Sequence, residues 1–453
     1  MKKLFYLTLL VLPFGKALRI PLLESNGKFI SLFPFDVLSF CLAIACAVHY
    51  WKQRHAPSRR PSIASPVTVF ILWSAITLLL DAIYFHLQFK DALFGSLYLL
   101  RWIQYIAFYY ATVEILAADP AEASKLLKFL FGGALAFSIF GIIQSVVLPD
   151  FALLLNPEAR PYIDYDPQGH RLVSTFMDPN ITAAYILFFA ILALSFYMNG
   201  RKRWLLPFLT LFVALVLTLS RGGALGFLMA GAALMIFTGG AKARRATIIA
   251  VVVLVVLAAA LYQILAPQLV EMERFSISDH SAMMRIEDWL VAINIVHDNP
   301  VMGIGFNTFG FISPMYGLER EGGMAFGFPG DLLLILTLTG AVGLVLYLRI
   351  YGKAFFAMRR LSRRFPMSDD GPLGRGLMAG MVGLLVSSFF TTVILYPEIM
   401  AIAWTLIGLV YSRLAVPCTV DITAPVAAMS FRPTLYQAFR SGLQRRTTQA
   451  EIS

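Results

Sequence analysis

Three arginines stand in short polar segments that break long apolar stretches of the sequence. Arg221 lies in the sequence Thr-Leu-Ser-Arg-Gly-Gly, Arg285 lies one helical turn before Trp289, and Arg171 begins a segment that ends at Asn180. Guanidinium groups bind phosphate oxygens in a bidentate manner and keep their charge at every relevant pH. Three of them on one face would stabilise the negative charge that develops on a diphosphate leaving group. The pattern therefore predicts a site for a phosphate-bearing substrate.

Each segment also has an ordinary structural interpretation. The first arginine could snorkel from a helix hairpin whose turn begins at Gly222, and the spacing of Gly222 and Gly226 permits close packing of two membrane helices. Arg285 could lie on an amphipathic helix that simply ends before Pro300. Arg171 could anchor the start of a membrane helix at the interface. These alternatives stay open at the level of sequence.

In their order and spacing along the chain, the three segments resemble the O-antigen ligase and Wzy-type polymerase family of polytopic envelope proteins. The resemblance rests on a Ser-Arg-Gly-Gly turn at 220–223, an Arg-x-x-x-Trp helix followed by Pro-x-x-Gly-x-Gly at 285–305, and a Phe-x-x-Pro-Asn helix start at 176–180. It implies inverting glycosyl transfer, without metal or cofactor, from an undecaprenyl-pyrophosphate-linked glycan to a glycan or lipid-linked acceptor. The reaction would take place on the outer leaflet of the bacterial inner membrane. The lipid bilayer and a chain-length regulator are the further partners considered, and no nucleic acid is expected.

The resemblance also implies roles for individual residues. Arg221 and Arg285 match arginines that engage the pyrophosphate and are expected to be catalytic, and Arg171 matches a basic position at the head of the Pro-Asn helix. The expected substrate-binding set also contains residues of the other motif segments, namely Asn180, Trp289, Gly303, Gly305 and Asn307.

The general base is the position at which this chain departs from the family. Ligases of the family have His-Asn at the start of the helix after the outer loop, where the chain instead has Phe-Pro-Gly followed by Asp331. A carboxylate at the head of an apolar span can act as a base, and it can equally cap the helix N-terminus. We expect Asp331 to be the base, with His280 and Glu287 as alternatives. The missing histidine favours a chain polymerase over a ligase.

Arg101 is the fourth arginine of interest, because it lies well inside an apolar run and is followed by several aromatic residues. It could line a path for the glycan, and it is therefore included among the substrate-binding residues, or it could pair with Asp81 or Asp91. An Asp-x-Asp pair at 164–166 has the spacing of a cation site, but in a proline-rich loop it is expected to be simply solvated. The six histidines show no ligand spacing, so no metal site is expected.

Composition then defines the elements that must position these residues. Of the 453 residues, 58% are hydrophobic and 14% are charged. A soluble domain is about 25% charged. The chain is therefore an integral membrane protein. The net charge of +11 is explained by membrane orientation and does not require a nucleic-acid partner. The three cysteines form no CxxC motif, and no Gly-x-x-x-x-Gly-Lys loop occurs, so neither a zinc site nor an ATP-driven pump is indicated.

Apolar runs predict an all-α polytopic protein of about twelve transmembrane helices. The expected runs cover residues 4–14, 32–50, 66–88, 92–117, 126–149, 173–198, 204–219, 222–238, 246–266, 331–351, 376–395 and 399–414. The first run also fits a secretory signal peptide, although no small-residue cleavage site follows it. The transmembrane domain is expected at 1–418, followed by a polar, partly disordered tail at 419–453.

Basic clusters alternate along these runs and fall on one side, which places both termini in the cytoplasm. The opposite, periplasmic side has two long loops, 150–172 and 267–330. The second loop contains apolar residues at helical spacing between 286 and 296, which predicts an amphipathic helix on the outer membrane surface. All three arginine motifs fall on this side.

A secondary transporter or flippase for an anionic lipid or solute is the alternative function. Its charged residues should lie near the bilayer midplane on broken helices. Here the motif residues are expected at or beyond the outer boundary, and the midplane offers chiefly Arg101. We therefore favour glycosyl transfer.

Overall fold

The computed structural model describes residues 1–14, 20–25, 28–52, 63–148, 171–239, 245, 280–318 and 330–415. Within these ranges, seven helices are long and apolar enough to cross a membrane: α2 (Pro34–Lys52), α3 (Ala64–Tyr84), α6 (Glu122–Val147), α8 (Pro179–Met198), α10 (Arg221–Thr238), α14 (Asp331–Arg364) and α16 (Pro397–Ala415). The chain is thus a polytopic helical membrane protein. The expected span at 246–266 and the expected tail at 419–453 lie outside the described residues.

Seven further helices are described. They are α1 (Lys2–Val11), α4 (Phe89–Tyr105), α5 (Ala107–Ala118), α9 (Leu205–Leu217), α12 (His280–Asp298), α13 (Phe309–Ile312) and α15 (Asp370–Ser387). Single 3-10 turns occur at η3 (Ser174–Phe176), η4 (Lys202–Trp204) and η5 (Ser313–Tyr316). The helix expected from the periodicity at 286–296 is present as α12.

Several details differ from the sequence expectations. An antiparallel hairpin of β1 (Ile20–Ser25) and β2 (Lys28–Leu32) is present in a fold that was expected to be all-α. The span expected at 92–117 is two helices, α4 and α5, which meet at a tight turn where the amide of Ile106 bonds the carbonyl of Ile103. No proline or glycine marks that turn, so the local sequence carries no signal for it. The span expected at 376–395 ends at Ser387, because the chain then enters an irregular segment.

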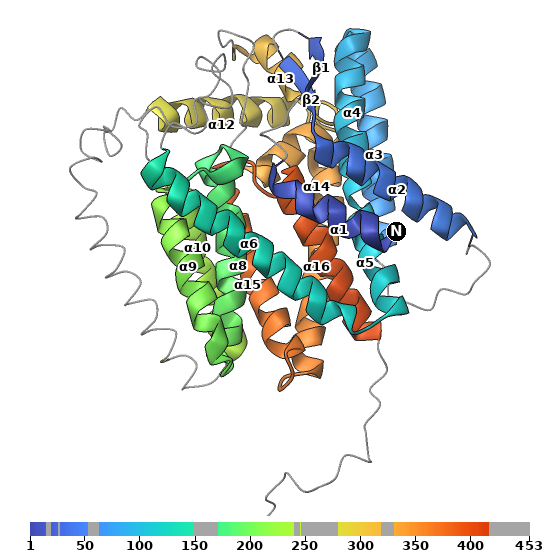
Figure 1. Ribbon diagram of the computed structural model, residues 1–453. Coiled ribbons are helices and arrows are strands. Elements are labelled where there is room, and N and C mark those ends of the chain that lie inside the picture. The colour runs from blue at the N-terminus through green and yellow to red at the C-terminus, as the bar shows by residue number, and fades with distance from the viewer. Residues whose placement is uncertain are drawn as a thin grey trace, which may run out of the picture. The chain divides into compact units, whose positions relative to one another are not determined.

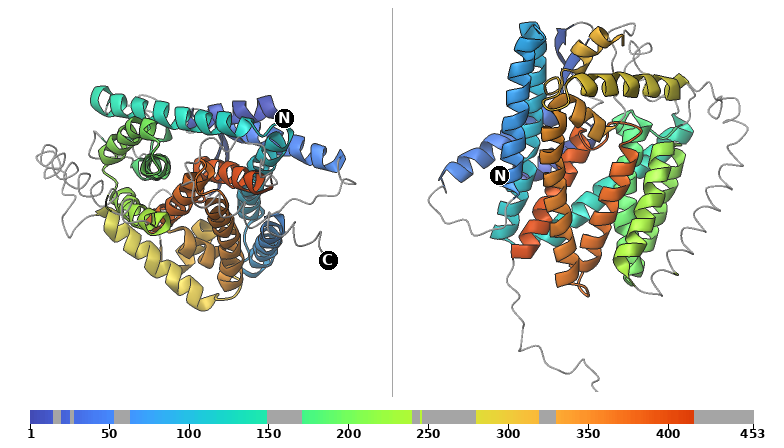
Figure 2. Two further views of the ribbon diagram at one scale, coloured as in Figure 1. Left: turned by 90° about the horizontal axis from the view of Figure 1, so that it is seen from below. Right: turned by 180° about the vertical axis from the view of Figure 1, so that it is seen from behind.

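The centre of the bundle is α8, whose residues are buried on nearly all sides. It packs against α9, α10 and α15 (Figures 1 and 2). Glycines permit a close crossing of two of these neighbours, because a Cβ on Gly226 of α10 would lie 2.7 Å from the carbonyl oxygen of Gly383 of α15. The close approach predicted from the spacing of Gly222 and Gly226 is therefore present, and α15 is the neighbour.

The short helix α1 packs into the same core. Phe5, Leu9 and Leu12 are buried, and Phe5 contacts the ring of Phe108 on α5. An ion pair of 2.9 Å between Lys2 and Glu122 joins α1 to the start of α6. With ten residues, α1 falls short of the roughly 20 that cross a bilayer.

One end of the bundle is covered by α12, which lies across the ends of the membrane helices (Figures 1 and 2). The turn between α9 and α10, the start of α8 and the start of α14 are at this same end (Figure 1). These are the elements that carry the arginine motifs and Asp331.

Candidate functional site

Two of the arginine motifs, well separated along the chain, form one hydrogen-bonded unit. The side chain of Arg171 donates through Nε to the carbonyl oxygen of Thr218 at 3.0 Å, and the amide of Leu172 bonds the carbonyl of Leu217 at 3.0 Å. The segment before α8 is thereby fixed to the turn between α9 and α10. Arg171 and Arg221 consequently belong to the same end of the bundle, although they lie on different elements.

The helix caps reinforce this connection. Asp178 caps α8 by accepting from the amides of Asn180 and Ile181, at 2.8 and 3.0 Å. Ser220 caps α10 by accepting from the amide of Gly223 at 3.2 Å. The Ser220 hydroxyl also donates to the Asn180 side-chain oxygen at 2.8 Å. Aspartate and serine are both residue types that favour the N-cap position. Arg221 is the first residue of α10, and its side chain is exposed.

Backbone strain is concentrated in the three motifs. Among the described residues, five that are not glycine have positive φ angles, and four of these lie in the motifs: Ser174, Met177, Leu219 and Asn307. Such conformations cost of order 1–3 kcal/mol each and persist where the surroundings enforce them. Strain of this kind clusters at functional sites.

Gln144 of α6 supplies part of that enforcement, and no sequence motif marks it. Its side-chain oxygen accepts from the amides of Val173 and Ser174, at 3.2 and 3.1 Å. The Ser174 hydroxyl in turn donates to the carbonyl of Phe137 at 2.9 Å. The segment that precedes α8 is therefore held by α6 as well as by the turn at Arg221.

The motif of Arg285 contacts a break in α14 through the turn that follows α12. Gly340 has φ 64° and ψ −174°, which interrupts the helical hydrogen bonds of this span. The carbonyls of Thr337 and Leu338 accept instead from the amides of Ile304 and Gly305, at 3.0 and 2.9 Å. These two freed carbonyls thus bond the turn that follows α12, as burial away from water requires.

Glycine is required on both sides of this contact. Gly303 has φ +80°, and a Cβ there would lie 2.5 Å from the carbonyl oxygen of Thr337. A Cβ on Gly340 would collide with the backbone of Val301. Trp73 of α3 completes the contact by donating its indole N–H to the carbonyl of Thr339 at 2.8 Å. Gly303 therefore faces protein backbone, which gives it a packing role besides the substrate-binding role expected from the sequence.

Residues 206–348 match the family model described as O-antigen ligase. The matched segment begins in α9 and ends within α14, so it includes Arg221, Arg285, Asp331 and the turn at Gly303. It confirms, over that segment, the family resemblance drawn from the motifs and the class of enzyme that this resemblance implies. Arg171, Asn180 and Arg101 lie outside it. No curated protein matches the chain.

Asp331, at the start of α14 in the O-antigen ligase segment, is fully buried. Its carboxylate accepts from the amides of Val393, Ile394 and Leu395, the shortest of these bonds being 2.8 Å to Ile394. The amide of Asp331 bonds the carbonyl of Ser388 at 3.3 Å. Asp331 therefore fastens the irregular segment between α15 and α16. The sequence left two roles open for Asp331, general base and helix cap. The geometry resembles capping, although the amides belong to a distant segment and not to α14.

The segment that Asp331 holds lies beside the first arginine motif. A Cβ on Gly222 would lie 3.1 Å from the Cβ of Phe390, so the start of α10 abuts the segment at 388–396. The segment at 388–396 therefore contacts both the start of α14 and the start of α10. Asp331 and Arg221 are thus coupled in structure through that segment.

Helix α12 carries Arg285 and Trp289, both of which are partly buried. One face of the helix, with Ala292 and Ile295, packs on Ile304 and the neighbouring apolar residues beside α14. Another stripe, formed by Ile286, Leu290 and Ile293, has about half of its surface exposed. Glu287 is exposed on this helix, and the side chain of His280 lies outside the described residues.

The turn after α12 is also fixed by side chains. The side-chain amide of Asn299 donates to the hydroxyl of Tyr316 at 3.2 Å. Burial raises the pKa of Tyr316, and the hydrogen bond from Asn299 opposes that rise. Asn307 is partly buried, with φ 59°, at the end of the same turn.

Arg101 pairs with Asp36, not with the Asp81 or Asp91 considered from the sequence. The distance from its guanidinium to the Asp36 carboxylate is 2.7 Å, and both side chains are largely buried between α2 and α4. Tyr105 donates to the same carboxylate at 2.7 Å. The sequence did not reveal this partner, because it lies 65 residues earlier on another helix.

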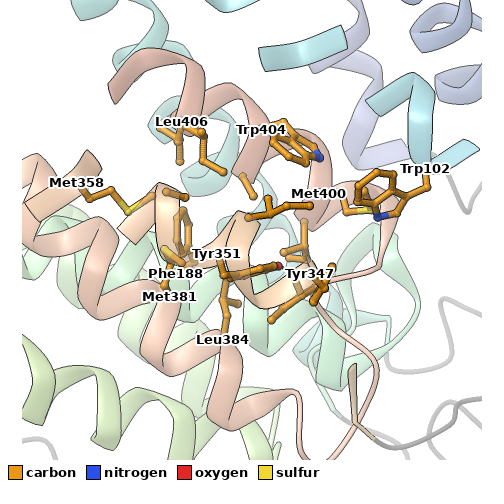
Figure 3. Close-up of a pocket in the computed structure, with 16 residues that line it drawn as sticks. Trp102, Phe188, Tyr347, Tyr351, Met358, Met381, Leu384, Met400, Trp404 and Leu406 are labelled. Carbon is orange, nitrogen blue, oxygen red and sulfur yellow. Dashed lines mark hydrogen bonds between the residues drawn. The ribbon is translucent and has the colours of Figure 1, made fainter. Parts of the chain in front are cut away.

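A separate cavity opens between α14, α15 and α16 (Figure 3). Its walls are apolar side chains such as Trp102, Met400 and Trp404, apart from the hydroxyls of Tyr347 and Tyr351, which lie 3.3 Å apart. None of the motif arginines lines it. The cavity is therefore distinct from the candidate site.

Proposed function

We propose that this protein transfers glycans from an undecaprenyl-pyrophosphate-linked donor to an acceptor hydroxyl, as a polysaccharide polymerase in preference to a ligase. The observation that carries the proposal is that two hydrogen bonds hold the motifs of Arg171 and Arg221 together. Arg171 donates to the carbonyl of Thr218, and Ser220 donates to the side chain of Asn180. The match of the O-antigen ligase family to residues 206–348 supports the same chemistry. The donor pyrophosphate would bind at the end of the bundle that α12 covers.

In the proposed reaction, the acceptor oxygen attacks the anomeric carbon of the donor glycan. The bond from that carbon to the pyrophosphate oxygen breaks, and the configuration inverts. Arg221 and Arg285, with Arg171, would stabilise the negative charge on the departing undecaprenyl pyrophosphate, because guanidinium groups bind its oxygens bidentately. Trp289, Asn180 and Asn307 would contact the glycan, and neither metal nor cofactor would take part.

The acceptor proton needs a base within about 3 Å. Asp331 is the candidate from the sequence, yet its buried carboxylate is committed to three backbone amides. This geometry favours Asp331 as a positioning residue that holds the segment beside Gly222. Glu287, exposed on α12, and His280 are then the candidates for the base.

The transport alternative receives one observation in its favour, because α14 is a broken helix of the kind that forms transporter sites. The carbonyls released at Gly340 are, however, bonded by Ile304, Gly305 and Trp73. They are thus not available to a solute in this arrangement. We therefore keep glycosyl transfer as the proposed activity.

The orientation belongs to the same proposal. Both termini would be cytoplasmic, with about twelve spans, and the site would face the periplasm of a bacterial inner membrane. Residues 1–418 would form the transmembrane domain and 419–453 a cytoplasmic tail. The exposed stripe of α12 at Ile286, Leu290 and Ile293 would rest on the outer surface of the bilayer.

The direct test is glycan transfer by the purified protein in liposomes, supplied with undecaprenyl-pyrophosphate-linked oligosaccharides and with neither nucleotide nor metal. A ladder of longer lipid-linked chains would establish a polymerase, and a single new adduct on a lipid or protein acceptor would establish a ligase. If the protein moves the lipid-linked substrate across the membrane without transferring glycan, the transporter takes the place of the enzyme.

A further inference from the structure

The inner end of α14 carries a cluster of arginines that the proposed reaction does not use. Four arginines stand within the six residues from 359 to 364. Three of them, Arg360, Arg363 and Arg364, line a hollow together with Leu414 near the end of α16. The ends of α14 and α16, which carry these residues, lie at the opposite end of the bundle from α12 (Figure 1).

The pairing of these arginines differs from that of their neighbours. Nearby arginines have defined polar partners: Arg201 pairs with Asp369 at 2.8 Å, Arg413 pairs with Asp370 at 3.3 Å and Arg375 bonds the Asn199 side chain at 2.6 Å. Within the described part of the chain, neither Arg360 nor Arg363 forms a hydrogen bond or ion pair with a carboxylate. Arg364 donates to the carbonyl of Leu414 at 2.8 Å, which holds its guanidinium at the wall of the hollow.

Their spacing concentrates positive charge on one surface. Arg360 and Arg364 are one turn apart on the helix, and Arg363 stands between them, so their like charges repel one another. A basic residue in the last turn of a helix is favoured by the helix dipole, which accounts for single arginines at such a position. Arg360 and Arg363, which lack a carboxylate partner within the described part of the chain and line the same hollow as Arg364, are better explained by an anion that binds there.

The surface next to the hollow is apolar on the side toward the membrane. Phe356 lies one helical turn before Arg360 and has 57% of its surface exposed. The helix face therefore changes from apolar to basic within one turn, as a phospholipid does from its acyl chain to its phosphate. Guanidinium groups suit a phosphate diester because their paired N–H groups match its oxygens.

We propose that Arg360, Arg363 and Arg364 bind the phosphate of an anionic phospholipid in the inner leaflet, with an acyl chain beside Phe356. Basic pockets between membrane helices on the cytoplasmic side bind such headgroups in general. The site depends on the orientation of the chain but not on glycan transfer. It lies at the far end of α14 from Asp331.

The test compares two variants of equal charge by native mass spectrometry of the purified full-length protein with added cardiolipin or phosphatidylcholine. The hollow variant is Arg360→Gln/Arg363→Gln. The matched control is Arg349→Gln/Arg359→Gln, which removes two exposed arginines of the same helix that do not line the hollow. We expect wild type and control to retain cardiolipin over phosphatidylcholine, and the hollow variant to lose about tenfold in cardiolipin occupancy.

Several results would overturn the proposal. Equal losses in both variants would mean that surface charge alone attracts the lipid, and equal retention of phosphatidylcholine would mean that the headgroup is not recognised. Binding of inorganic phosphate to lipid-free wild type, without retention of cardiolipin, would assign the hollow to a soluble phosphate compound. Melting temperatures of both variants would be measured first, so that a lost adduct is not confused with unfolding.

Discussion

The hydroxyl of Ser220 donates to the side-chain oxygen of Asn180 at 2.8 Å and at the same time accepts from the amide of Gly223. One atom thus caps α10 and ties its start to the start of α8. The direction in which Arg221 leaves its helix is therefore coupled to the segment that carries Arg171.

Replacing Ser220 with alanine should lower both stability and transfer. Loss of an N-cap costs about 1 kcal/mol of stability, and loss of the bond to Asn180 frees the turn that bears Arg221. We expect transfer to fall about tenfold in liposomes, since misplacement of a charge-stabilising group reduces the rate. Ser220→Thr, which keeps the hydroxyl, is the control. A double-mutant cycle with Asn180→Ala that shows additive effects would contradict the coupling.

Arg221→Ala and Arg285→Ala should each reduce the transfer rate about 100-fold or more, because each removes a group that stabilises the leaving pyrophosphate. Lysine at either position should restore little activity, because an ammonium does not bind two oxygens in a fork. The exposed Arg203 on the opposite side of the membrane provides the control, since Arg203→Ala should leave transfer unchanged. Full activity in both arginine variants would exclude the proposed donor site.

Asp331→Asn separates a positioning role from a basic one. If Asp331 only holds the segment at 393–395, the variant should melt at a lower temperature and transfer more slowly, while the pH dependence of the rate keeps its shape. If Asp331 is the base, the rate should fall about 100-fold or more with the fold intact, and the limb of the pH profile that reports the base should disappear. We expect the first result.

The break in α14 predicts opposite effects for two glycines of that helix. Gly340→Ala should be strongly destabilising, because an alanine is strained at a positive φ. Its Cβ would also collide with the backbone of Val301. Gly352 is helical and its position has open space. Gly352→Ala should therefore be neutral or stabilising by about 0.5–1 kcal/mol. Thermal unfolding in one detergent compares both, and similar melting temperatures would contradict the broken helix.

Arg101 can be assigned by a paired substitution. Asp36→Asn or Arg101→Met alone leaves one charge of the pair buried. An unpaired buried charge costs about 3–5 kcal/mol. The double variant Asp36→Asn/Arg101→Met removes both charges, keeps an acceptor for the Tyr105 hydroxyl and should recover most of the stability. If its transfer activity also recovers, Arg101 is structural. If stability recovers and activity does not, Arg101 contacts the glycan as the sequence suggested.

The fold was predictable wherever the pattern is local. Hydropathy locates most of the described membrane helices, and apolar periodicity locates α12, because each depends only on neighbouring residues. The spacing of Gly222 and Gly226 also predicts a close helix crossing. The turn at Ile106 was missed, since no glycine or proline marks it. The hairpin of β1 and β2 was missed as well.

The sequence allowed the residues of the candidate site to be selected, but not the residues that hold them in place. The arginine motifs stand out because arginine is costly in an apolar stretch. Asp36, Gln144 and Trp73 could not be selected, because each acts on a segment far away in the sequence. The buried contacts of Asp331 depend likewise on an irregular stretch that hydropathy assigned to a helix.

The interruption at Gly340 has a consequence for how the protein accommodates membranes of different thickness. A continuous helix that tilts to match a thinner bilayer moves both of its ends. In α14, backbone bonds hold the break itself: the carbonyls of Thr337 and Leu338 accept from the turn at Ile304, and the amide of Ala341 donates to Pro300. From there the helix continues to the opposite end of the bundle. A change of tilt in the part of α14 after Ala341 can then take up hydrophobic mismatch without moving the part before Gly340. The start of α14 keeps its place beside α10 when the lipid composition of the cell changes.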